Sequence, residues 1–281
     1  MAWTISRFHD GNQPSAEATA LSQACNESAK MNTSTTIPTV WSPAEATGEY
    51  RDMLIRLMTR QLYAETATAE VFGRSIGVAP TWREKRLAAE FALEETQHSQ
   101  MLCDLLADLG EAPEAIIAQR PPAANFWSME LDDWLHIAVF NFTVDRAGSQ
   151  QIMEYRQSSY APWAEKMGIV LADEEGHYEN GVDNLREFAK QRLDEFQQVF
   201  NHMLPVTLKR AFGRPHGADN DFCLRTGLKR ASTEQVMNRY LHEMRGYMEP
   251  VGLKFPPMAL FEAEKVELMP STRDILLSLP S

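Results

Sequence analysis

Two stretches of the chain, Glu94-Glu95-Thr96-Gln97-His98 and Asp173-Glu174-Glu175-Gly176-His177, carry the same pattern of an acid followed by Glu-x-x-His. Residues three apart share one face of an α-helix, so each stretch can present one carboxylate and one imidazole to one metal ion. A single Glu-x-x-His on a helix is usually surface charge. Two copies, each among inward apolar positions, predict a carboxylate-bridged di-metal site.

Each copy follows another inward acid at nearly equal distance. Glu65 lies 30 residues before Glu95, and Asp145 lies 29 residues before Glu174. In an antiparallel helical hairpin, two residues share a height only when they are equally far from the turn, and both pairs meet this condition. The six side chains that we expect at one level are Glu65, Glu95, His98, Asp145, Glu174 and His177.

Two other acids are excluded by their position on the helices. Glu154 lies nine residues after Asp145, which is roughly 13 Å along a helix axis, and it falls off the apolar stripe. Glu70 lies five residues after Glu65 and points away from the stripe for the same reason.

Four carboxylates buried at one level require compensating charge. Without cations they would cost many kcal/mol or stay protonated. Hard carboxylate oxygens with imidazole suit iron, with manganese as the alternative. We therefore predict two metal ions, each held by three of the six side chains.

Hydrophobic periodicity predicts helices and no convincing strand. We expect the first helix to begin at Glu49 and to break over residues 73–80, with a turn near Ala79. Thr81 with Glu84 is a capping signal for the second helix, which Gly110 ends.

The remaining helices follow the same reasoning. The third is predicted from about Ser128, with Leu131 on its inward stripe, and the fourth from near Pro162 after a turn near Ser159. A fifth covers residues 193–203, and a sixth begins after a cap formed by Ser232 and Gln235.

With these residues in place, residues 49–257 resemble the catalytic oxygenase subunits of phenylacetyl-CoA epoxidase and benzoyl-CoA epoxidase, which are ferritin-like di-iron proteins. Beyond the two Glu-x-x-His pairs, the run Phe140–Gly148 is similar to the third-helix segment of that family, including its ligand Asp. Residues 252–257 match the end of the family's chain. Thr96-Gln97 departs from the Ala-Gly of the phenylacetyl-CoA branch.

The resemblance implies an all-α, ferritin-like four-helix bundle with additional C-terminal helices, and iron ligation by all six side chains. It implies a di-iron monooxygenase that uses O₂ to epoxidise or hydroxylate an organic substrate, with an aromatic or acyl thioester of CoA or a carrier favoured. We predict that residues 1–45 form a flexible arm, that residues 46–257 form the di-iron domain, and that residues 258–281 form a C-terminal tail.

The chain carries neither a Cys-rich cluster motif nor a GxGxxG after a strand, so its electrons are expected from an external donor, either a separate reductase or peroxide. A homo-oligomer or a helical partner subunit is also expected. One group of basic residues could bind the phosphates of such a substrate, although we favour the interpretation that these are ordinary solvent-exposed charges. The group is Lys209, Arg210, Arg214, Arg225, Lys229 and Arg230.

Two other functions use similar residues. An iron-storage or metal-oxidation protein is disfavoured by the long region after Phe188, and a non-catalytic partner subunit is disfavoured because all six positions are filled.

The amino-acid composition limits which binding partners and which cellular compartment we expect. A net charge of −12 and a pI near 5.1 argue against nucleic acid or an anionic membrane as a partner. The three cysteines lie far apart in the sequence, which predicts reduced thiols in a cytoplasmic protein. They are Cys25, Cys103 and Cys223. No apolar run approaches the ~20 residues that a bilayer requires.

Overall fold

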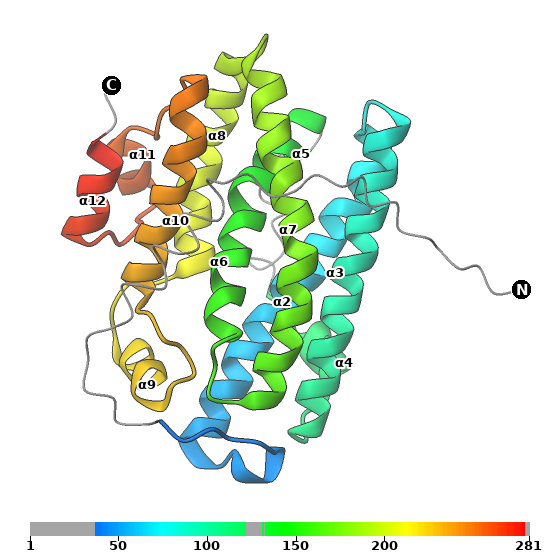
Figure 1. Ribbon diagram of the computed structural model, residues 1–281, viewed down its shortest axis with the longest axis vertical. Coiled ribbons are helices and arrows are strands. Elements are labelled where there is room, and N and C mark those ends of the chain that lie inside the picture. The colour runs from blue at the N-terminus through cyan, green and yellow to red at the C-terminus, as the bar shows by residue number, and fades with distance from the viewer. Residues whose placement is uncertain (1–36, 122–130, 132, 279–281) are drawn as a thin grey trace, which may run out of the picture. The chain divides into compact units, whose positions relative to one another are not determined.

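The computed structural model describes residues 37–121, 131 and 133–278, which are built almost entirely from helices (Figure 1). The β-structure of these residues is one isolated parallel bridge between Val40 and Tyr160. No helix in the described ranges is long and apolar enough to cross a membrane. Residues 1–36 of the predicted arm and Cys25 lie outside the described residues.

Four long helical segments form the bundle, so the predicted all-α, ferritin-like architecture is confirmed. They are α2 (Gly48–Val78), α3 (Trp82–Asp108), the composite of α5 (Trp134–Phe140), a π-helical segment η3 (Asn141–Asp145) and α6 (Arg146–Tyr155), and α7 (Ala161–Ala189). Helix α2 packs on α3, α6 packs on α7, and α3 contacts α7 between these two hairpins.

The ends of α2 and α3 differ slightly from expectation. Thr81 accepts a hydrogen bond from the Glu84 backbone N–H at 3.4 Å, which confirms the predicted cap. Helix α2, however, continues through Gly73 to Val78 instead of breaking at residue 73. It ends where Ala79 precedes Pro80, because a proline disfavours helical geometry in the residue before it.

The third helix begins later than predicted. Asp133 caps α5 by accepting from the His136 N–H at 2.9 Å, so Leu131 lies before the helix rather than on its stripe. The predicted start at Ser128 lies outside the described residues. The periodicity also missed the π-helical segment that ends at Asp145, because one wide turn barely disturbs a stripe.

Gly181 of α7 lies directly against this π-helical segment. A Cβ at Gly181 would sit 2.9 Å from the backbone nitrogen of Phe142 and 3.0 Å from the carbonyl carbon of Asn141. Only glycine therefore allows the two backbones to approach this closely. The close approach of α7 accompanies the short side chain of Asp145, at a position where di-metal helical bundles usually carry the longer glutamate.

Two hydrophobic clusters lie on either side of the acidic level. Along α7, Trp163, Met167 and Val170 belong to one cluster, whereas Val182 and Leu185 belong to the other. Glu174 and His177 fall between them. Packing on both sides therefore holds the polar level inside the bundle.

The other elements pack beside the bundle. Ser232 and Gln235 form the predicted capping box of α10. Helix α11 contributes Phe261, and α12 contributes Ile275, to the same hydrophobic cluster as α8 and α10. The domain boundary predicted at residue 257 stays a prediction.

The remaining helices of the described residues have the following bounds: η1 (Pro43–Glu45), α4 (Pro113–Ala118), α8 (Leu193–Thr207), η4 (Leu208–Phe212, π-helical), α9 (Ala218–Thr226), α10 (Thr233–Met248), η5 (Glu249–Val251), α11 (Met258–Ala263) and α12 (Pro270–Leu277).

We predict that Gly181→Ala destabilises the protein by about 1–3 kcal/mol, because the added methyl group forces α7 away from the π-helical segment. Gly176→Ala, on the exposed side of the same helix, is the matched control and should stabilise by up to about 1 kcal/mol. Urea unfolding measures both changes. Equal stability of the two variants would show that the close contact is not needed.

Candidate metal centre

The structure brings all six predicted side chains together in the bundle, and each is at most 6% exposed. They divide into two groups of four, and within each group the possible ligand atoms all lie within 4.8 Å of one another. The first group is Glu65, Glu95, His98 and Glu174, and the second is Glu95, Asp145, Glu174 and His177. The spacing of the six residues in the sequence predicted two sets of three ligands, one set for each metal ion. The geometry adds that Glu95 and Glu174 belong to both sets, which is the position of bridging carboxylates.

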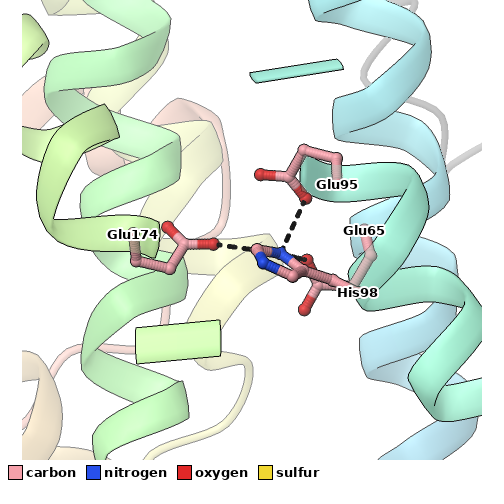
Figure 2. A group of neighbouring side chains, drawn as sticks. All are labelled: Glu65, Glu95, His98 and Glu174. Atoms are coloured by element: carbon pink, nitrogen blue, oxygen red, sulfur yellow. Dashed lines mark ion pairs between the residues drawn. The ribbon is translucent and has the colours of Figure 1, made fainter. Parts of the chain in front are cut away.

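Figure 2 shows Glu174 reaching from α7 towards His98, which lies with Glu95 on α3 beside Glu65 of α2. The Nδ1 atom of His98 lies 3.6 Å from a Glu65 oxygen, 3.8 Å from Glu95 and 3.9 Å from Glu174. One imidazole nitrogen thus faces three carboxylates.

His177 repeats this arrangement on the other side. Its Nδ1 atom lies 3.3 Å from Glu95, 3.4 Å from Asp145 and 3.8 Å from Glu174. The rings of Phe72 and Phe91 pack against the imidazole, with centroid distances of 5.5 and 4.2 Å. The histidine is therefore held in one orientation by apolar contact.

The outer nitrogen of each histidine contacts the acid that begins the opposite repeat. His98 Nε2 lies 3.3 Å from Asp173 on α7, and His177 Nε2 lies 3.0 Å from Glu94 on α3. A carboxylate in this place fixes the ring and makes its inner nitrogen a better ligand. The sequence contained the signal, since both repeats begin with an acid, but spacing alone did not assign these residues a role.

Gln61 positions Glu65. Its side-chain amide donates to Glu65 Oε1 at 2.8 Å, and its carbonyl oxygen accepts from the Trp163 indole N–H at 3.0 Å. Trp163 in turn stacks on Tyr155 with a centroid distance of 4.3 Å. The indole determines which end of the amide faces Glu65. Gln61 lies four residues before Glu65, on the same face of the helix, but helical spacing alone does not predict this contact.

The donor atoms fit a pair of divalent cations. Five buried atoms of the cluster have no hydrogen-bond partner: both carboxylate oxygens of Glu95, Oδ2 of Asp145, and Nδ1 of His98 and His177. Buried polar atoms normally have partners, so these five atoms are available to bind an ion. Four carboxylates carry the charge that two divalent cations balance. Oxygen and imidazole donors suit iron or manganese.

The protonation of the cluster shows the same need for positive charge. Burial opposes a charged His98 ring, but the nearby negative charges of Glu65 and Glu95 outweigh it and raise the His98 pKa to about 11. Burial, with the neighbouring charge of Glu65, raises the pKa of Glu95 to about 7. In the absence of a cation, protons take its place, and metal binding must release them.

A cavity of about 420 Å³ opens onto the carboxylates. Its lining includes the four carboxylates Glu65, Glu95, Asp145 and Glu174 but neither His98 nor His177. The cavity therefore reaches the carboxylates of the cluster and not its imidazole rings. The remaining lining residues come from α2, η3, α6, η4 and Pro121, and they are Arg60, Gln61, Tyr63, Ala64, Thr68, Val144, Gly148, Gln151, Ile152, Tyr155, Arg210 and Ala211.

Both acids that were excluded as ligands have other partners. Glu154 is 1% exposed and accepts from the backbone N–H groups of Arg230 and Ala231 and from the Arg239 guanidinium. It therefore anchors the segment before α10. Glu70 accepts from Arg120 at 2.8 and 2.9 Å.

The basic grouping is only partly associated with the cavity. Arg210 lines it, and Lys229 donates to the lining residue Gln151 at 3.0 Å. Lys209 and Arg214 instead pair with Glu264 and Glu267. Arg60, which sequence reasoning passed over, also lines the cavity.

The chain is similar to a known protein family and to individual proteins of known activity. The family model described as phenylacetic acid catabolic protein matches residues 31–267. The chain is 29% identical to benzoyl-CoA oxygenase component B of Aromatoleum evansii over 172 residues, which cover 57% of this chain and 36% of that protein. It is 22% identical to one subunit of the 1,2-phenylacetyl-CoA epoxidase of Escherichia coli (strain K12) over 236 residues, covering 81% of this chain and 75% of that one. The chain thus spans about a third of the first relative.

We predict about two iron ions per chain after anaerobic loading, and a higher Tm than without metal, because a ligand that binds only the folded state stabilises it. His98→Ala and His177→Ala should each lose iron and the gain in Tm while keeping their helical circular dichroism. His242→Ala, on an exposed surface, is the control. Full iron content in both cluster variants would make the histidines ordinary core residues.

We also predict that Asp145→Asn empties one metal position. Glu154→Gln should keep both ions, but it should lower stability by about 1–3 kcal/mol, because it weakens a buried network of hydrogen bonds. Iron analysis combined with urea unfolding separates the two effects. Loss of iron from Glu154→Gln, with normal iron in Asp145→Asn, would contradict the assignment.

Proposed function

Because the chain belongs to the phenylacetic acid catabolic protein family, we propose that it is the oxygenase subunit of a di-iron monooxygenase. The two relatives are named as an oxygenase component and an epoxidase subunit, which supports an oxidoreductase. The finer assignment rests on the cluster and on the cavity beside it.

One observation carries this proposal: an organic-sized cavity ends at the four carboxylates of the cluster. An iron store needs a path for ions but no apolar cavity of this size beside the metal. Pockets of about 300–1000 Å³ are typical of small-molecule sites. We infer that the cavity holds the carbon atom that is oxygenated.

The six side chains would hold two iron ions, with Glu95 and Glu174 shared, Glu65 and His98 on one ion, and Asp145 and His177 on the other. When bound, the reduced pair would supply the two electrons that monooxygenation requires, with one atom of O₂ entering the substrate as an epoxide or alcohol and the other leaving as water. The protein residues around it have separate tasks.

Asp173 and Glu94 hold the outer nitrogens of the histidines, so that Nδ1 of each ring faces the centre. Gln61 holds one oxygen of Glu65 by a direct hydrogen bond. Val144, Ile152 and Tyr155 keep part of the cavity apolar and exclude water from the reacting carbon. Manganese in place of iron is the alternative occupant of the same ligands.

The substrate class proposed is an aromatic or acyl thioester of CoA or a carrier. The relatives are named for benzoyl-CoA and phenylacetyl-CoA. A cavity of about 420 Å³ accommodates an aromatic acyl group rather than a whole CoA thioester. Arg60 and Arg210, which line the cavity, could then pair with phosphates as charged donors.

We also propose that electrons come from a separate reductase and that the chain works with other proteins. One relative is named as a component and the other as a subunit, and both words denote parts of larger enzymes. Within the described residues, Cys103 and Cys223 are single free thiols, which offer no ligand set for an iron–sulfur relay.

A single-turnover experiment tests this function without the reductase. Iron-loaded protein is reduced with dithionite, freed of excess reductant, mixed with benzoyl-CoA or phenylacetyl-CoA, and exposed to ¹⁸O₂. We expect a thioester product that carries one ¹⁸O atom, detected by mass spectrometry, and no product from Asp145→Asn. Oxidation of the iron with no oxygen in either thioester would favour metal oxidation or storage.

A further inference from the structure

One face of the η3–α6 segment is directed into the cavity, and Gly148 lies in the middle of it. Successive lining residues are spaced by one or three positions, which places them on one side of the helix. They are Val144, Asp145, Gly148, Gln151, Ile152 and Tyr155. Gly148 lies one turn after Asp145, so it borders the place where the cavity meets the cluster.

Packing does not require glycine at this position. A Cβ built on Gly148 would meet no heavy atom within 4 Å outside its own helix and chain neighbours. At Gly181, in contrast, the added Cβ would collide with backbone atoms. Glycine in a helix interior is less favourable than alanine. Gly148 therefore costs stability without relieving any contact.

The space beside Gly148 continues along small residues on the facing wall. Ala64 and Thr68 line the cavity from α2, next to Glu65 and one turn from it. Farther along α6, Gln151 is fixed by Lys229, whose Nζ atom also lies 5.4 Å from the centroid of the Tyr155 ring. The wall beside the cluster thus carries small side chains, and the hydrogen-bonded Gln151–Lys229 pair lies farther along α6.

We propose that Gly148 is a specificity-determining residue whose missing side chain leaves room for the acyl group of the substrate beside Asp145. The residue at position 148 then sets the largest acyl group that can reach the cluster. This inference rests on the proposed function for the identity of the substrate, but the space itself does not depend on that function.

The test compares Gly148→Ala and Gly148→Leu with Gly176→Leu, the same change on the exposed side of α7. Dissociation constants are measured for acetyl-CoA, benzoyl-CoA and phenylacetyl-CoA with the iron-loaded 281-residue chain. Gly148→Leu should weaken binding of the two aromatic thioesters by about tenfold or more, because the side chain fills their space. Acetyl-CoA binding should change less than about twofold, and Gly176→Leu should change neither.

Unchanged binding of the aromatic thioesters to Gly148→Leu would overturn the proposal, as would an equal loss for acetyl-CoA. Xenon, bound to crystals of the same variants under pressure, reports on the space independently of any thioester. If no thioester binds the unaltered protein, but Gly148→Leu removes a cavity xenon that Gly176→Leu retains, the proposed substrate class fails and the role of Gly148 in keeping the space open stands. A cavity xenon that persists in Gly148→Leu would overturn that role.

Discussion

The structure depends on one electrostatic constraint: four carboxylates lie at one level inside a helical bundle. Isolated buried charges are too costly to persist without partners. Two imidazoles at the same level offset at most half of this charge even when both are protonated, and five potential ligand atoms of the cluster have no hydrogen-bond partner. Two divalent cations remove the imbalance. The hydrophobic clusters on both sides then supply the packing that keeps the polar level buried.

The elements around this level determine the positions of the ligands. Each repeat supplies a Glu and a His, and its first acid supports the histidine of the other repeat. The two hairpins are thereby linked through the centre. The symmetry is incomplete, because Gln61 donates to Glu65 whereas Oδ2 of Asp145 has no such partner. The two metal positions should therefore differ in how rigidly their terminal carboxylates are held.

The ligand level could be predicted from sequence because the relevant information is local. Helical phase and equal distance from a turn bring Glu65 to Glu95, and Asp145 to Glu174, without knowledge of the tertiary structure. Contacts between distant helices were not accessible in this way. The Trp163–Gln61 bond joins α7 to α2, and the partners of Glu154 lie more than seventy positions later in the chain. The π-helical turn was missed because it rotates the helix face by less than the width of the apolar stripe. The short helices α9, α11 and α12 have too few turns to show a clear hydrophobic period.

Anomalous diffraction at the iron absorption edge, from crystals grown anaerobically with Fe²⁺, tests the di-iron centre most directly. We predict two peaks inside the six side chains, separated by about 3.5–4 Å as in other two-metal sites. One peak should lie beside Glu65 and His98, and the other beside Asp145 and His177. A single peak, or none at this level of the bundle, would contradict a di-iron centre.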